Sequence, residues 1–192
     1  MLSKKFDSGR MSILEGERRK EILDVEKILE AVGHYLGDKV ADIGCGPGYF
    51  SIPISKRIRP QGEVYAIDTE KAMLDRLKEN IVAESGIRIV QSQEESIPKV
   101  PDSSVDSCLM VNVLHELEGN KTLQEAYRIL RPGGYLVLVD WKKIKMEFGP
   151  PYPVRISERE AIRRCEEIGF RVEGSFFPGQ YNYGVVLRKP EE

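Results

Sequence analysis

Glycines stand at alternate positions in one short stretch, at Gly44, Gly46 and Gly48, directly after the apolar run of residues 39–43. Glycine weakens regular structure by about 0.5–1 kcal/mol relative to alanine, so this cluster indicates a ligand that closely approaches the backbone. A strand that turns into a helix through glycines presents free N–H groups to such a ligand. The third glycine of a dinucleotide-binding loop would fall at Tyr49, and no Gly-Lys-Ser/Thr of a phosphate-binding loop follows. The loop therefore predicts a site for an adenosine-like or amino-acid-like ligand.

A carboxylate follows at the distance that a ribose-binding residue usually has. Asp68 ends a second apolar run, about 20 residues beyond Gly48. Carboxylates at this spacing accept hydrogen bonds from ribose hydroxyls. An Asx turn at a strand end is the alternative reading of Asp68 by itself.

Strand and helix patterns alternate along the chain from residue 39 onward. Apolar β-rich runs predict strands at residues 39–44, 63–68, 87–92, 105–112, 135–141, 170–177 and 182–189. Helical spacing lies between them, at residues 49–58, 71–81, 123–130 and, after the cap pair Ser157 and Glu160, up to Gly169. The pattern predicts an α/β, Rossmann-like, doubly wound and mostly parallel seven-stranded sheet, with helices on both faces and an antiparallel C-terminal strand. Ligands of such sheets lie at the carboxyl ends of the strands, where the glycine loop falls.

Chain length and linker content favour a single domain over residues 1–192. Residues 18–32 have helical spacing, so we expect an N-terminal helical cap over residues 1–35 and a Rossmann-like core over residues 36–192.

Composition narrows the class of protein further. Lys and Arg (29) nearly balance Asp and Glu (31), and the net charge of −2 provides no overall attraction toward nucleic acid. Cys45, Cys108 and Cys165 match neither a zinc site nor a disulfide framework, which favours a reducing compartment. No apolar run has the length of a signal core or a membrane span. We therefore expect a cytoplasmic protein with no membrane or metal, and core positions for Cys108 and Cys165.

Four segments, in this order, resemble motifs of the class I S-adenosylmethionine-dependent methyltransferases, and of their small-molecule, methyltransferase-11-like type. They are "VADIGCGPGYFSIPISK", "VYAIDTEKAML", "IPKVPDSSVDSCLMVNVLHEL" and "EAYRILRPGGYLVLVDW", and the resemblance covers residues 39–189. It implies S-adenosylmethionine as cofactor, S-adenosylhomocysteine as product, and no metal.

The resemblance also implies which residues hold the methionine part of the cofactor. They are Asp42 and the loop residues Gly44, Cys45, Gly46 and Gly48, in part through backbone atoms.

For the adenosine part, the resemblance implies Asp68 on both ribose hydroxyls, with Thr69 and Met73 beside the adenine. Many relatives then have an acidic side chain that accepts from the adenine amino group. Gln93 stands at that place, with Glu94 next to it, and the amide oxygen of Gln93 can also accept.

At the end of the fourth strand, the resemblance implies that Asn112 faces the amino group of the cofactor or the methyl-transfer space. His115 is the candidate base, but a helix-start histidine without a chemical role is the favoured reading, so no catalytic residue is assigned. His34 is expected to be structural.

The acceptor is expected to be a small molecule, because little chain lies outside the predicted core. Residues 1–35 and 142–156 are the only such material, and Phe6, Trp141, Phe148 and Tyr152 could form the walls of a pocket there. Basic residues between positions 4 and 20 alternate with acidic ones, as on a solvated helix face, which makes nucleic acid an unlikely partner. The Pro-Pro-aromatic motif of base and glutamine methylases is absent after the fourth strand, and "GPPY" at residues 149–152 predicts a rigid turn.

Other functions remain open at this point. The chain could be a catalytically silent S-adenosylmethionine-binding module that acts with a partner. An NAD(P)-dependent oxidoreductase is disfavoured by Tyr49, and an RNA or protein methyltransferase is disfavoured because little chain lies outside the predicted core.

Overall fold

The computed structural model describes residues 22–33, 37–82, 85–93 and 96–191. The predictions made for Phe6, His34, Glu94 and the basic residues between positions 4 and 20 lie outside these ranges.

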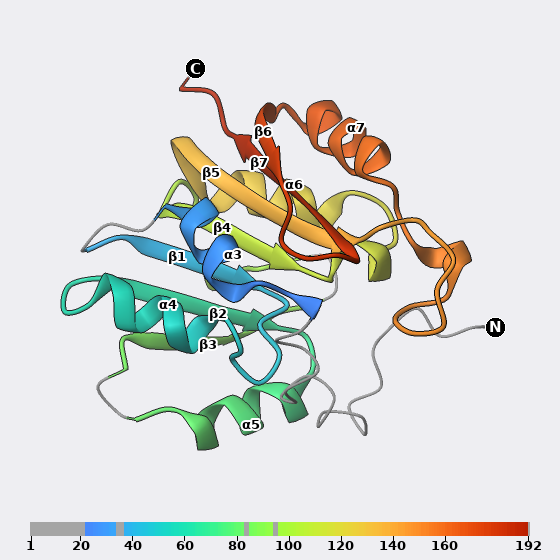
Figure 1. Ribbon diagram of the computed structural model, residues 1–192. Coiled ribbons are helices and arrows are strands. Elements are labelled where there is room, and N and C mark those ends of the chain that lie inside the picture. The colour runs from blue at the N-terminus through green and yellow to red at the C-terminus, as the bar shows by residue number, and fades with distance from the viewer. Residues whose placement is uncertain (1–21, 34–36, 83–84, 94–95, 192) are drawn as a thin grey trace.

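A seven-stranded sheet in the order β3-β2-β1-β4-β5-β7-β6 forms the centre of the molecule (Figure 1). The strands are β1 (Lys39–Ile43), β2 (Glu63–Asp68), β3 (Ile87–Gln91), β4 (Val105–Val111), β5 (Leu130–Trp141), β6 (Arg171–Phe176) and β7 (Asn182–Arg188). β1 to β5 pair in parallel, and β7 is antiparallel to both of its neighbours. The predicted fold class is confirmed.

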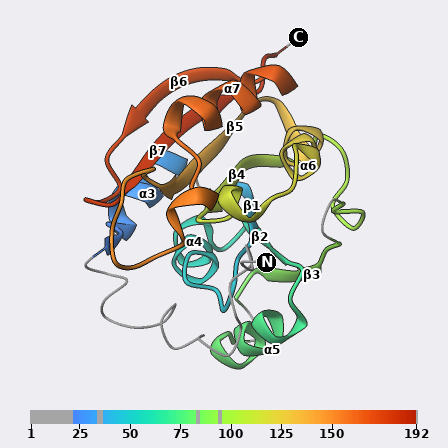
Figure 2. The same ribbon diagram turned by 90° about the vertical axis from the view of Figure 1, so that its right-hand side faces the viewer.

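Helices cover both faces of the sheet (Figures 1 and 2). The elements are α3 (Val25–Val32), α4 (Ser51–Ile58), α5 (Lys71–Asn80), α6 (Lys121–Ile129) and α7 (Glu158–Ile168), with the short 3-10 turns η2 (Leu114–Glu116) and η3 (Tyr152–Val154). Alternate strand residues point to opposite faces, so Val40 and Val64 pack with α3 and α4 while Ala41 and Tyr65 pack toward α6 and α7.

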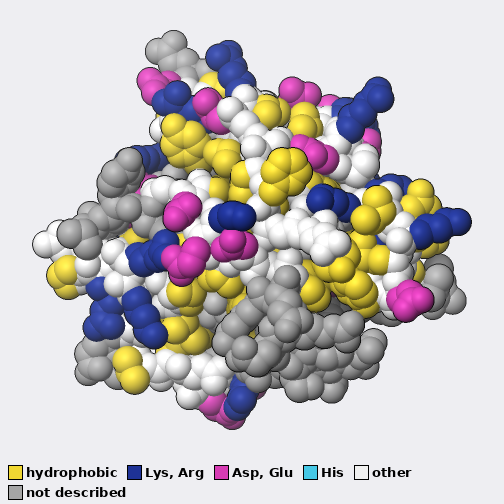
Figure 3. Space-filling view, viewed as in Figure 1, with side chains coloured by type: hydrophobic (Ala, Val, Ile, Leu, Met, Phe, Trp, Pro, Cys, Tyr) yellow, Lys and Arg dark blue, Asp and Glu magenta, His cyan; other side chains and the backbone are white. Residues whose placement is uncertain are grey.

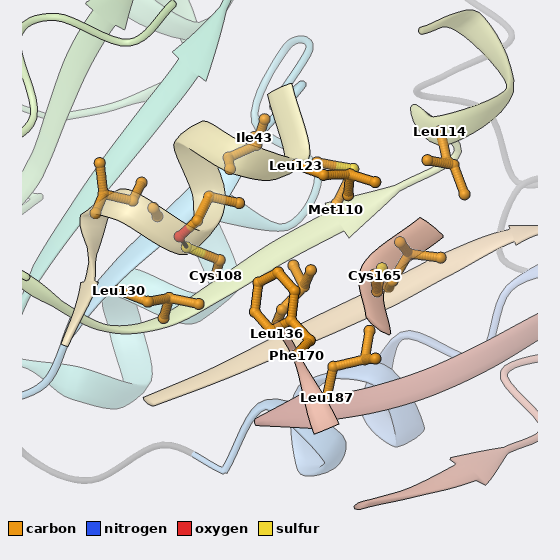
Figure 4. Packing of buried hydrophobic residues seen from close by; sticks show 14 of the residues in the cluster. Ile43, Cys108, Met110, Leu114, Leu123, Leu130, Leu136, Cys165, Phe170 and Leu187 are labelled. Atoms are coloured by element: carbon orange, nitrogen blue, oxygen red, sulfur yellow. Dashed lines mark hydrogen bonds between the residues drawn. The ribbon is translucent and has the colours of Figure 1, made fainter. Parts of the chain in front are cut away.

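The larger part of the core lies between the sheet and the pair α6 and α7. Figure 4 shows Cys108, Leu136, Cys165, Phe170 and Leu187 directed toward one another in this layer. The Cys108 thiol donates to the Ala126 carbonyl oxygen at 3.8 Å, and burial raises the pKa of that thiol. The core positions predicted for Cys108 and Cys165 are confirmed.

The described part of the predicted helix at residues 18–32 is interrupted once. Ile22 is helical, Leu23 and Asp24 are not, and α3 begins at Val25, where Asp24 caps it: Lys27 N donates to Asp24 Oδ1 at 3.2 Å. The Asp24 N–H donates to the Pro178 carbonyl oxygen at 2.6 Å, which joins the start of α3 to the segment before β7. α3 packs on the sheet face through Ile28, as a layer of the core.

Residues 131–134 ("RPGG") end α6, as predicted, but they already belong to β5, which begins at Leu130. The cap at Ser157 is present, with Glu160 N donating to its hydroxyl oxygen at 3.3 Å. α7 ends at Gly169, whose φ of 118° is unfavourable for other residues.

The carboxyl ends of the parallel strands face the viewer in Figure 2, and η2 and η3 lie at this edge. In the described part of the chain, no helix has the length and apolarity needed to span a membrane.

Shortening a side chain in the main core should destabilise the fold. Leu136 is fully buried, and we expect Leu136→Ala to lower the free energy of unfolding by about 2–5 kcal/mol, because it removes apolar contacts and leaves a cavity. Val172→Ala is the control: Val172 is 39% exposed on the edge strand β6, and we expect a change below about 0.5 kcal/mol. Urea unfolding followed by circular dichroism measures both. Equal losses in the two variants would contradict this placement of the core.

Candidate functional site

The glycine loop lies at the switch point of the sheet, where β1 is flanked by β2 on one side and β4 on the other. Directly after β1, the N–H groups of Gly44 and Cys45 both donate to the Ile67 carbonyl oxygen, at 2.8 and 3.0 Å. The loop is therefore held against the end of β2, next to Asp68.

The three positions of the loop differ in what a side chain would meet there. A Cβ on Gly44 would lie 2.3 Å from Val113 Cγ2, and a Cβ on Gly48 would lie 2.3 Å from Leu77 Cδ1. A Cβ on Gly46 would meet nothing within 4 Å, and all three residues have positive φ. Gly44 and Gly48 thus permit close packing inside the protein, whereas Gly46 leaves open space beside its backbone.

Asp68 and Gly46 are brought into direct contact. The Gly46 N–H donates to Asp68 Oδ2 at 2.8 Å, and the Glu70 N–H donates to Asp68 Oδ1 at 2.9 Å. Burial raises the pKa of Asp68 above its usual value, although the N–H groups of Glu70 and Gly46 oppose the shift. A carboxylate with satisfied but exchangeable N–H partners is suited to accept hydroxyl donors from a ligand.

Asp42 lies beneath the loop. It is 1% exposed, and the hydroxyl of Ser51, the first residue of α4, donates to its Oδ2 at 2.6 Å. Asp42 therefore couples the end of β1 to the start of α4, and its contact with a ligand stays a prediction. Cys45 is also buried, which raises the pKa of its thiol and favours packing over chemistry.

The residues predicted to lie near the adenine follow Asp68 and the neighbouring strand β3. The Thr69 carbonyl oxygen accepts from Gln91 Nε2 at 3.4 Å, and the exposed Gln93 lies two residues beyond the end of β3. Met73 lies on α5 and is 4% exposed. The structure places these residues at the same edge as Asp68, and their roles stay predictions.

Asn112 directly follows β4 and has a left-handed backbone conformation, with φ 58°, which asparagine tolerates better than most residues. Its Oδ1 accepts from Nδ2 of Asn182 at 2.9 Å. Asn182 is fully buried at the start of β7, and its own Oδ1 has no hydrogen-bond partner. β7 therefore fixes the side chain that the sequence predicts to face the methyl-transfer space.

His115 and Asp140 form a buried pair close to Asn112. His115 Nδ1 lies 2.8 Å from Asp140 Oδ1, and the His115 N–H donates to Asp140 Oδ2 at 3.0 Å. The side chains are 5% and 0% exposed. Burial lowers the pKa of His115, but the hydrogen bond and charge of Asp140 outweigh it, and the pKa lies above its ordinary value of 6.5.

A buried arginine organises the loop between β5 and α7. Arg155 is 2% exposed and donates to three backbone carbonyl oxygens: Nε to Pro150 at 2.7 Å, Nη1 to Ile144 at 2.8 Å and Nη2 to Phe148 at 2.7 Å. Its guanidinium also lies 5.9 Å from the ring centroid of Trp141. These contacts hold the loop at the carboxyl edge of the sheet.

Three aromatic rings pack edge to face in this loop region. The centroids of Trp141 and Phe148 are 6.1 Å apart, and those of Phe148 and Tyr181 are 4.7 Å apart. Tyr152, predicted to belong to the same wall, is 44% exposed and near Lys143. Tyr181 takes part instead, because β7 brings it beside the end of β5.

Charges are mixed on the outer surface. On the face shown in Figure 3, Lys and Arg side chains lie interspersed with Asp and Glu. Such an arrangement is typical of a solvated surface.

A sheet of this order, with a glycine loop and a strand-end carboxylate at its switch point, defines a Rossmann-like protein that binds a nucleotide-type ligand. Residues 41–138 match the family model described as a methyltransferase domain. The chain belongs to this family, and with it to the class I S-adenosylmethionine-dependent methyltransferases.

Similar proteins agree with this assignment. The chain is similar to a SAM-dependent methyltransferase from Aquifex aeolicus of known crystal structure, with 35% identity, a TM-score of 0.89, and coverage of 96% of this chain and 99% of that one. It is 29% identical to the demethylmenaquinone methyltransferase of Staphylococcus aureus strain JH9 over 140 aligned residues. The aligned region covers 72% of this chain and 56% of that protein. It is also 29% identical over 124 residues to an uncharacterized 37.1 kDa protein in transposon TN4556 of Streptomyces fradiae, covering 63% of this chain and 36% of that protein. The chain thus spans between about a third and somewhat more than half of these two curated relatives.

Sequence reasoning did not find Asp140, Asn182 and Arg155. Asp140 had a detectable signal, because it is one of the last two residues of a strand, just as Asp42 and Asp68 are. Asn182 and Arg155 had none, since their partners are distant in the sequence or are backbone atoms.

The different surroundings of Gly44 and Gly46 predict different effects of the same substitution. Gly44→Ala should destabilise the fold by about 1–3 kcal/mol through overlap with Val113, in addition to about 1–2 kcal/mol of backbone strain. In urea unfolding, Gly46→Ala should lower the free energy of unfolding only by the backbone strain of about 1–2 kcal/mol. It should also weaken S-adenosylmethionine binding in equilibrium dialysis, because the new Cβ enters the open space beside residue 46.

The double variant Gly44→Ala, Val113→Ala is the control, because it removes the overlapping methyl group. We expect it to be more stable than Gly44→Ala alone. A double variant that is less stable than Gly44→Ala would contradict the proposed overlap.

Proposed function

We propose that this protein transfers a methyl group from S-adenosylmethionine to a small-molecule acceptor by in-line displacement. The observation that carries the proposal is the contact at 2.8 Å between the Asp68 carboxylate and the Gly46 N–H, with open space beside Gly46. It joins a hydroxyl-accepting group to a glycine backbone that a ligand can approach.

The residues present fit this cofactor. Asp68 would accept the ribose hydroxyls, and the loop from Gly44 to Gly48 would hold the methionine part through its backbone. Bound S-adenosylmethionine supplies a methyl group that is already activated by a positively charged sulfur. The protein can therefore act largely by positioning the acceptor and excluding water.

The acceptor side of the proposed site favours a small molecule. In the described ranges, the loop of residues 142–154 is the main segment that extends beyond the strand ends. Arg155 stabilises this loop by donating to three of the loop's backbone carbonyl oxygens. Trp141 and Phe148 give it an aromatic wall. The similarity to a demethylmenaquinone methyltransferase supports a small acceptor as well.

Removal of the Asp68 carboxylate should weaken cofactor binding without unfolding the protein. Hydrogen bonds to charged groups contribute about 1.5–3 kcal/mol, so we expect Asp68→Ala to lower the affinity for S-adenosylmethionine by about 10- to 100-fold. Calorimetric titration measures the affinity. Asp75→Ala is the matched control, because Asp75 is ion-paired with Lys78 on the surface of α5. Unchanged affinity in Asp68→Ala would place the cofactor elsewhere.

The acceptor class can be determined with methyl-labelled S-adenosylmethionine and a fractionated lysate of the source organism. We expect label in the metabolite fraction. Label in RNA or protein would contradict the small-molecule proposal, and no label despite cofactor binding would favour the silent binding module. Binding of a nicotinamide cofactor in its place would favour the oxidoreductase.

A further inference from the structure

Asp140 holds His115 from two sides. Its carboxylate accepts the backbone N–H of His115 at 3.0 Å, lies 2.8 Å from the ring Nδ1, and accepts the Trp141 N–H at 2.6 Å. The carboxylate is fully buried, so water does not compete for these contacts. The position of the imidazole is therefore fixed by both its backbone and its ring.

This contact also determines which ring nitrogen carries the proton. An ionised carboxylate can only accept, so the neutral imidazole must place its hydrogen on Nδ1, next to Asp140. Nε2 then has a free electron pair. It lies 3.8 Å from Glu116 Oε1, which is beyond hydrogen-bonding distance.

The pair lies at the proposed site of methyl transfer. η2, which contains His115, begins two residues after Asn112, and Val113 between them lies where a Cβ on Gly44 would overlap it. On the other side, Asp140 is followed by Trp141, which packs against the loop held by Arg155. His115 is thus connected to the cofactor loop through Val113 and to the proposed acceptor wall through Asp140 and Trp141.

We propose that His115 is the general base of the reaction, that Asp140 is its positioning residue, and that the acceptor atom carries an acidic O–H. This inference rests on the proposed function. The O–H bond breaks and its proton goes to Nε2 of His115. The electron pair left on the oxygen forms the bond to the methyl carbon, and the pair of the carbon–sulfur bond stays on sulfur, which becomes a neutral thioether. The proton then passes from Nε2 to solvent.

The charges around the imidazole determine its pH dependence. Asp140 and Glu116 favour the protonated ring, while burial and the nearby Arg155 oppose protonation. The balance puts the pKa of His115 above 6.5. Because only the neutral ring can accept a proton, the transfer rate should increase as the pH rises through that pKa and level off above it.

A purely structural role makes a different prediction. In that case the pair would only fix η2, and any side chain that donates to Asp140 would replace His115. Asparagine is such a side chain, since its amide nitrogen can take the place of Nδ1 but provides no base at the place of Nε2. His115→Asn therefore separates the two roles.

The first test is nitrogen-15 NMR of the histidine rings in the protein without ligand. The chain has 2 histidines, so a His34→Gln variant assigns the signals. We expect the neutral ring of His115 to carry its hydrogen on Nδ1, to titrate above pH 6.5, and to titrate at lower pH in Asp140→Asn. A hydrogen on Nε2 would overturn the proposal.

The second test compares methyl transfer to catechol, which must lose a proton, with transfer to iodide, which has none. We expect His115→Asn to lower transfer to catechol by about 10²- to 10⁴-fold while transfer to iodide stays within about threefold of wild type. Equal changes for both probes, or a wild-type protein that binds cofactor but does not methylate catechol, would overturn the proposal. Equilibrium dialysis with S-adenosylmethionine accompanies each variant, and a wild-type protein that fails to bind it would refute the proposed function itself.

Discussion

The carbonyl oxygen of Ile67 is the point on which the site depends. It accepts the N–H groups of Gly44 and Cys45 where β1 ends, and this contact turns the chain toward α4. The same turn places the Gly46 N–H on Asp68. An apolar parallel strand pair thus ends in a polar junction, and its few donors and acceptors are satisfied inside the protein or directed at a ligand.

The other half of the site, around Asn112 and His115, is held by contacts with the strands β5 and β7. The antiparallel strand β7 lies beside β5 and carries Asn182, whose side chain donates to Asn112 at 2.9 Å. Asp140, the residue before the last of β5, holds His115. Removing Asn182 or His115 would take a hydrogen-bond partner from the side chain of Asn112 or from the buried carboxylate of Asp140, and the loss of such a partner is destabilising.

The two halves also meet through side-chain packing. Val113 lies against Gly44, so the turn after β4 can approach the cofactor loop only because that position has no side chain. The spacing of the glycines therefore reflects two constraints. Gly44 and Gly48 satisfy the packing of the protein, and Gly46 alone leaves space for a ligand.

The sequence by itself determined the order of strands and helices, because alternating apolar periods and turn residues are local properties. It also identified the Gly44 loop and Asp68, since both occur at fixed positions relative to single strands. Only the tertiary structure paired Asp140 with His115 and Asn182 with Asn112, because these contacts join residues that are 25 and 70 positions apart. Local patterns carry no signal for such contacts, which exist only after β5 and β7 have taken their places in the sheet.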